Sequence, residues 1–305
     1  MNRIVLLVVV TGMLCVSWVG IGWAEKIAFL IPERFVAGLD NPPAAADVPL
    51  VWESLEIGTP DGGLPEVGLF ALAKRLESQG HSITFYGTDS DDAASVIADN
   101  DLVFISEAIG SGSVVTGTYS DYYLSPKPVI TTESYVLDNF FLATASSPFT
   151  GGANTNRLKV VDPNHAITKG LPPSFFFTVK DEVTNEPAIV TIGTVRDESI
   201  LVEGVGHILV RIDGPGPSAD TDIQPPDDAV AVMVVDKGEK SIEDEVFPAR
   251  FVFIGYSDVA PGEEFGGDPE SKTFALLSDT GWQLWDNAFN WALGKPTPIE
   301  EWEIH

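Results

Sequence analysis

The sequence predicts an α/β fold built on a mostly parallel, open sheet with helices on both faces. In its first half, short apolar segments without polar alternation are separated by segments of helical period. Strands that are apolar on both faces are typical of a parallel sheet covered by helices on each side. In the second half, further apolar segments follow one another with few helical segments between them, which predicts extra β-strands.

The expected elements can be placed along the chain. A helix begins near Pro65 and ends before Gly80, a shorter one lies within 89–99, and a closing helix is capped by Ser278 and stopped by Gly294. Strands are expected at 26–31, 82–87, 101–105 and 127–132, and then at 157–161, 188–195, 208–212, 229–235 and 250–254.

The two ends of the chain are expected to lie outside the folded domain. Arg3, the apolar run from Ile4 to Val19, and Gly22-Trp23-Ala24 have the pattern of a signal peptide that is cleaved after Ala24. No second apolar run long enough to span a membrane follows. The expected organisation is a signal peptide at 1–24, a single domain at 25–296 and an acidic tail at 297–305, in a secreted or periplasmic protein that has no membrane attachment after cleavage.

Composition excludes several classes of function. The 305 residues carry a net charge of −28, which repels nucleic acids and anionic lipids, so nucleic-acid binding is not expected. The single cysteine, Cys15, lies inside the expected signal peptide, so the mature chain would have no disulfide, thiolate metal site or cysteine nucleophile. With 44% hydrophobic and 10% aromatic residues, the chain is apolar enough to bury a large core.

One segment resembles a known family. The residues from Val161 to Pro172 read Val-Asp-Pro-Asn-His-Ala-Ile-Thr-Lys-Gly-Leu-Pro, and Asp181-Glu182 follow soon after. This stretch resembles the Asp-Pro-x-His-Pro-Ile-x-x-Gly-Leu-Pro pattern of the trehalose-utilisation-like (ThuA-like) proteins. It departs from the pattern at Ala166, where the family has proline, and at Val183-Thr184, where an aromatic residue is usual. The resemblance, which extends to related uncharacterised secreted bacterial domains, implies the class I glutamine-amidotransferase-like fold.

The resemblance implies this fold without its glutaminase reaction. True amidotransferases place a cysteine on a Gly-x-Cys-x-Gly elbow, and the mature chain has no cysteine. The nearest serine version, from Gly110 to Ser113, lacks the final glycine. The elbow position, after the fourth expected strand, holds Glu133. Glutaminase chemistry is therefore excluded.

Polar residues follow the expected strands at their carboxyl ends, where open parallel sheets bind ligands. Glu107, Glu133 and Asp258 come from three such ends and are expected to face one crevice, as general acid and base or as oxygen ligands of a cation. The alternative is that these acids cap the helices that follow. The residues expected to bind a ligand beside them are Ser106, Tyr135, Ser257 and Asp258.

His165 is the most specific candidate. It would act as a general base or metal ligand, or alternatively hydrogen-bond the backbone of its own turn. No His-x-x-x-His or His-Glu pair occurs, so a zinc site is not expected. Calcium is the one cofactor that stays open, because acids cluster at 89–92 and 220–228; neither cluster fits an EF-hand loop, and a solvated face is the alternative.

Two functions stay open. The first is a secreted, non-glutaminase binding or interaction module, whose partner would be a carbohydrate or another extracytoplasmic protein. The second is a hydrolase or isomerase that acts on a sugar-like substrate through Glu107, Glu133 and His165. An exposed, aromatic-lined crevice favours the first function, and acids with raised pKa values that converge on His165 favour the second.

Overall fold

The structure is a computed structural model of the chain. It describes residues 24–31, 66–87, 92–106, 120–144, 150–180, 185–188, 190–195, 198–201, 204–214, 229–241, 243–255 and 274–296. The expected signal peptide up to residue 23 and the expected tail at 297–305 lie outside these ranges. The same is true of three predicted site residues, Glu107, Ser257 and Asp258.

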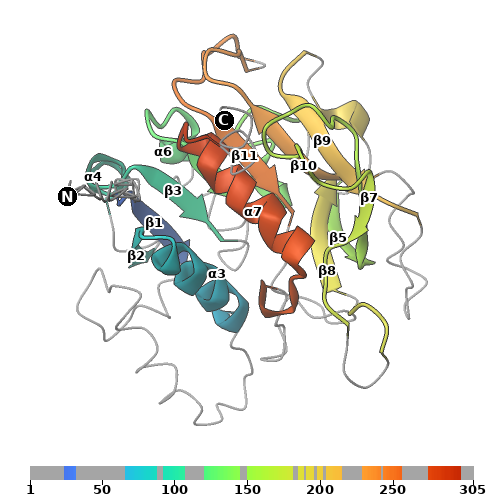
Figure 1. Cartoon of the computed structure of the whole chain (residues 1–305). Helices are drawn as coiled ribbons and strands as arrows, with labels where there is room; N and C mark the ends of the chain where they lie inside the picture. Colours follow the sequence, from blue (N-terminus) through green and yellow to red (C-terminus); the bar gives the residue numbers. More distant parts are fainter. Residues whose placement is uncertain are drawn as a thin grey trace, which may run out of the picture.

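The described strands form one 11-stranded sheet, and its first half is parallel. The strands of this half run in the order β2-β1-β3-β4-β11, each parallel to its neighbour. Figure 1 labels β2, β1, β3 and β11 of this half. The predicted parallel sheet is therefore confirmed for this half. Its members are β1 (Lys26–Ile31), β2 (Ser82–Gly87), β3 (Leu102–Ile105), β4 (Val129–Thr131) and β11 (Phe251–Ile254).

The extra strands of the second half continue the same sheet in the antiparallel sense. From β11 the order is β10 (Val230–Val235), β9 (His207–Ile212), β6 (Arg157–Val160) and β7 (Ser174–Phe176). Two more strands, β5 (Thr150–Thr155) and β8 (Val190–Val195), pair with each other off this path. We call these two strands the β5–β8 ribbon. It joins the sheet where Val195 of β8 pairs with Val230 of β10.

Helices cover both faces of the parallel half, as predicted. α3 (Glu66–Ser78) and α7 (Asp279–Ala292) lie together in front of the sheet (Figure 1). The predicted cap of the closing helix is present, because Ser278 Oγ accepts the N–H of Gly281 at 3.1 Å. α4 (Ala93–Asp99) and α6 (Ser120–Tyr123) pack on the other face. Short 3₁₀ helices are η2 (Ser134–Val136), η3 (Glu198–Ile200) and η5 (Phe274–Leu276).

β1 shows why the parallel strands are apolar at nearly every position. Ile27, Phe29 and Ile31 pack into the core that α3 and α7 cover. Ala28 and Leu30 pack into the second core, on the face that carries α4 and α6. Successive side chains of a strand point to opposite faces, so a strand buried on both sides needs apolar residues throughout.

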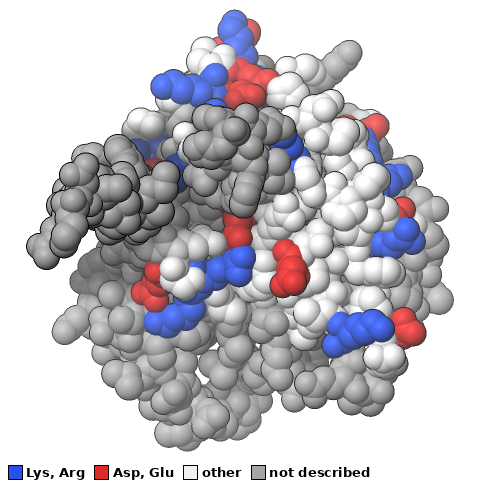
Figure 2. Space-filling view, in the orientation of Figure 1, with Lys and Arg blue, Asp and Glu red and all other residues white. Residues whose placement is uncertain are grey.

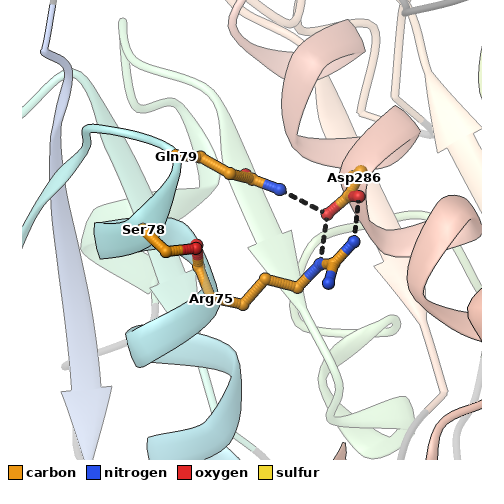
Figure 3. A network of polar contacts seen from close by, with 4 residues as sticks. All are labelled: Arg75, Ser78, Gln79 and Asp286. Carbon is orange, nitrogen blue, oxygen red and sulfur yellow. Dashed lines mark hydrogen bonds and ion pairs between the residues drawn. The ribbon is translucent and has the colours of Figure 1, made fainter.

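An ion pair joins the two helices of the first face. Arg75 of α3 donates to Asp286 of α7 from Nε at 2.8 Å and from Nη2 at 2.6 Å, and Gln79 Nε2 donates to the same carboxylate at 2.8 Å (Figure 3). The guanidinium of Arg75 also lies 4.7 Å from the centre of the Trp282 ring. Two parallel hydrogen bonds to one carboxylate fix the orientation of α3 relative to α7.

The surface over α3 and α7 mixes both signs of charge. Among the described residues visible on this face, basic and acidic side chains are interspersed (Figure 2). None of the helices in the described part of the chain is both long enough and apolar enough to cross a membrane.

Candidate functional site

The carboxyl ends of the parallel strands bring buried polar side chains to one edge of the sheet. Strand order reverses at β1, because β2 lies on one side of it and β3 and β4 lie on the other. Ser106 follows β3 at this reversal, and its N–H donates to the carbonyl of Leu30 in β1 at 3.3 Å. Open sheets bind ligands outside such a reversal. Glu133 follows the next strand along, so two of the residues predicted for one site share this edge.

Glu133 is a buried acid, with 3% of its surface exposed. Its Oε1 accepts the N–H of Tyr135 at 2.7 Å, which makes Glu133 the N-cap of η2. Glu133 therefore caps the helix that follows it, as the alternative interpretation of these acids expects. Burial raises the pKa of Glu133 to about 7, and the hydrogen bond from Tyr135 acts in the opposite direction. The carboxyl group is therefore protonated in a large share of the molecules at neutral pH.

The surroundings of Glu133 are rich in hydroxyl groups. The N–H of Glu133 donates to Thr131 Oγ1 at 3.1 Å, and the N–H of Thr132 donates to the carbonyl of Ile105 at 3.1 Å. Tyr135, which was predicted to bind a ligand, lies partly exposed on η2 beside the acid. Five buried hydroxyl side chains, each at most 2% exposed, belong to the residues at this edge: Ser106, Thr131, Thr132, Ser134 and Thr194.

His165 lies at the opposite edge of the sheet. Its ring packs against Trp291 near the end of α7, with ring centroids 5.0 Å apart. The guanidinium of Arg250 lies 4.6 Å from the same Trp291 ring, and Arg250 directly precedes β11. Because β4 and β11 run parallel, the residue before β11 and Glu133 after β4 stand at opposite ends of the strands. The structure therefore does not bring His165 together with Glu133.

His165 stabilises its own turn, as the alternative interpretation predicted. Its Nδ1 accepts the N–H of Ile167 at 3.2 Å, and its carbonyl oxygen accepts the N–H of Thr168 at 3.0 Å. Asn287 of α7 donates from Nδ2 to the carbonyl of Ile167 at 3.0 Å. The segment that resembles the ThuA-like pattern is thus a turn that packs on α7.

The protonation of His165 follows from this arrangement. Burial lowers the pKa of His165, although the carboxylates of Asp236 and Asp162 act to raise it. In the neutral ring, Nδ1 is the hydrogen-bond acceptor and Nε2 carries the proton. A general base needs that acceptor nitrogen, which the N–H of Ile167 already occupies.

Several expectations concern residues outside the described ranges. The possible contributions of Glu107, Ser257 and Asp258 are among them, as are most of the two acidic clusters proposed for calcium. Asp92, the described member of those clusters, is the N-cap of α4 and accepts from Ser95 N at 3.2 Å and Ser95 Oγ at 3.0 Å. Within the described ranges, no group of three or more His, Cys, Asp or Glu side chains is arranged to hold a metal ion.

Sequence reasoning missed the β5–β8 ribbon as part of the carboxyl edge. Gly193 of β8 lies next to the segment that carries Glu133, because a Cβ added to Gly193 would be 3.4 Å from both the carbonyl oxygen of Thr132 and Ser134 Oγ. The signal in the sequence is the glycine itself, since glycine inside a strand often marks a close approach of another backbone.

Comparison with known proteins finds similarity among solved structures. No protein-family model and no curated protein matches the sequence. Among solved structures, the chain is similar to a putative ThuA-like protein from Bacteroides uniformis, with 11% sequence identity, a TM-score of 0.48, and coverage of 88% of this chain and 92% of that one. The name of that structure is the family that the 161–172 segment resembles. At this score, the similarity carries no argument about activity or ligand.

Proposed function

We propose that the protein is a binding module that holds an uncharged, oxygen-rich ligand of the carbohydrate class at the carboxyl edge of its parallel strands. One observation carries the proposal: the Glu133 carboxyl group is buried beside the reversal of strand order and is held by a single backbone donor at 2.7 Å. A buried polar atom gains stability from a ligand that supplies a hydrogen bond.

The chemistry of the edge supports an uncharged ligand. A protonated carboxyl group both donates and accepts hydrogen bonds, and so do the hydroxyl groups of a sugar. The hydroxyl side chains of Ser106 and Thr194 add uncharged polar character at the same edge. An anionic ligand would meet the repulsion of a chain whose net charge is −28. These features together support a neutral saccharide.

Calorimetric titration with a panel of neutral mono- and oligosaccharides tests the proposal. We expect at least one saccharide to bind, and we expect Glu133→Ala to weaken that binding about tenfold or more, which corresponds to roughly 1.4 kcal/mol or more. The matched control is Glu243→Gln, an exposed acid between β10 and β11, which should leave the Kd unchanged. The proposal is wrong if no saccharide of the panel binds to the wild type, or if Glu133→Ala binds the saccharide with the same Kd as the wild type.

The raised pKa of Glu133 supports a second candidate, a hydrolase or isomerase of sugar-like substrates. A carboxyl group that titrates near pH 7 can both give and take a proton at neutral pH. His165 takes no part in this version, because it lies at the other edge. Turnover that disappears in Glu133→Gln while saccharide affinity is retained would favour catalysis over binding alone.

A further inference from the structure

The β5–β8 ribbon packs on the segment that carries Glu133. Gly193, on β8, lies against both chain neighbours of the acid, Thr132 and Ser134. Both strands of the ribbon contact η2, the short helix that Glu133 caps. The ribbon therefore packs on the two residues that flank Glu133 and on the helix that Glu133 caps.

Glycine at position 255 permits a close approach between β11 and the ribbon. Gly255 directly follows β11, and a Cβ added to it would lie 1.6 Å from the carbonyl oxygen of Gly193. Real Cβ atoms do not come that close to a backbone atom, so with any other residue at 255 the backbone at this contact must shift. Gly255 itself is tied to the sheet, because its N–H donates to the carbonyl of Ala231 at 2.9 Å. An alanine at 255 would therefore strain this contact, and we expect β8 to shift away from β11 against the anchors described next.

The ribbon is also anchored by its own side chains. Ile192 is 1% exposed and packs into the core under α3 and α7. Val195 is fully buried in the core on the opposite face of the sheet. These two anchors and the Gly255–Gly193 contact hold β8 in one place relative to Glu133.

We infer that the β5–β8 ribbon is a wall that keeps water from the Glu133 carboxyl group, and that Gly255 is the position that lets the ribbon come close enough to do so. The inference rests on the proposed binding site and assigns Gly255 a positioning role in it. By excluding water, the wall keeps the acid in the uncharged form that suits a neutral ligand. The elements around Glu133 are β3, β4, β5, β8, β11 and η2. Among their described residues, the titratable side chain is that of Tyr135.

The titration of Glu133 in the ligand-free protein tests this inference. The carboxyl carbon is followed by NMR in a chain labelled with carbon-13 glutamate, and Glu133→Gln assigns the signal. We expect Gly255→Ala to lower the midpoint by about one pH unit or more, because water reaches the carboxyl group once the ribbon moves. Gly281→Ala is the matched control: its Cβ would lie 2.3 Å from the carbonyl oxygen of Phe177, a comparable clash, and the Glu133 midpoint should not change.

A second variant covers the case in which Gly255→Ala does not fold. Ile192→Ala removes an anchor of the ribbon without a clash, and we expect a smaller downward shift of the same midpoint. Either folded variant with a wild-type Glu133 titration would overturn the inference. Because no ligand is used, this outcome is independent of the saccharide titration. If the Glu133 midpoint shifts in the variants but no saccharide binds to the wild type, the inference about the ribbon stands and the proposed function is wrong.

Discussion

The two edges of the parallel sheet hold their candidate residues in contrasting ways. At the carboxyl edge, Glu133 is almost fully buried, accepts one backbone N–H, and has its pKa raised to about 7. At the opposite edge, where the parallel strands begin and which we call the amino edge, His165 is half-buried against Trp291. It accepts the N–H of Ile167 and has its pKa lowered. Burial causes both shifts, since it disfavours the charged form of either group.

The contrast shows that a shifted pKa does not by itself mark a functional position. What differs is how far neighbouring groups satisfy the polar atoms. The acceptor nitrogen of His165 is occupied within its own turn, and α7 holds that turn through Asn287. Glu133 accepts one hydrogen bond from the described residues, from the N–H of Tyr135. We therefore propose that the Glu133 carboxyl group is available to hydrogen-bond a ligand. The polar atoms of the His165 turn instead make hydrogen bonds within the folded protein.

Removing the aromatic support of the amino edge is expected to have the largest effect. Trp291 is 6% exposed and contacts both His165 and Arg250. We expect Trp291→Ala to lower the free energy of unfolding by about 3–5 kcal/mol, the usual loss for a buried tryptophan, and urea denaturation measures it. Trp282→Ala, on the same helix but only half-buried, is the control and should cost clearly less. Equal losses would contradict a specific role for Trp291 at this edge.

Glu133→Gln is expected to change stability in a pH-dependent way. The folded pKa, about 7, lies above the ordinary value of 4.5. The unfolded chain therefore releases this proton between pH 4.5 and 7 while the folded chain keeps it, so the wild type loses stability as the pH rises through that window. Glutamine cannot ionise, and its oxygen still accepts the N–H of Tyr135. We expect the variant to match the wild type at pH 4 and to be up to about 3 kcal/mol more stable at pH 8.

Denaturation with urea at pH 4, 6 and 8 checks this prediction, with Glu243→Gln as the exposed control. A variant that is less stable than the wild type at pH 8 would contradict it. That outcome would mean that Glu133 is ionised and paired with a cation in the folded protein, and addition of a calcium chelator to the wild type would then identify the cation.

The sheet and its helices were predictable where local pattern and tertiary packing agree. The observed bounds of β1 and β2 equal the predicted ones, because both are apolar runs bounded by turn residues. Gly80 has a φ of +93°, which explains why α3 ends just before it. β5 was missed because four of its six residues, Gly-Gly-Ala-Asn, are depleted in strands, and its conformation depends on pairing with β8.

The candidate site was predictable only in part. Glu133 follows a parallel strand, and the rule for carboxyl ends places it correctly. His165 follows β6, which belongs to the antiparallel half, so the same rule says nothing about its edge. The contact between Gly255 and Gly193 joins residues far apart in the sequence, and no local pattern encodes it.

Of the three substitutions, Trp291→Ala, Glu133→Gln and His165→Ala, the last is expected to change the free energy of unfolding least. The change removes the acceptor of the Ile167 N–H, and Ile167 is fully buried, so we expect a loss of about 1–3 kcal/mol in the free energy of unfolding. His165→Asn should recover much of this loss, because an asparagine oxygen can accept a backbone N–H two residues along the chain.

The pH dependence of these two variants separates a structural role from a catalytic one. The folded pKa of His165 lies below its ordinary value of 6.5, so the unfolded chain takes up a proton near pH 6.5 that the folded chain does not. The wild type therefore loses this part of its stability as the pH falls below 6.5, and the gap between the wild type and His165→Asn should narrow from pH 8 to pH 5. Neither variant should move the Glu133 titration or weaken saccharide binding. A fully stable His165→Ala protein that has lost saccharide binding or turnover would show that the two edges act together, and it would reverse the roles assigned to them.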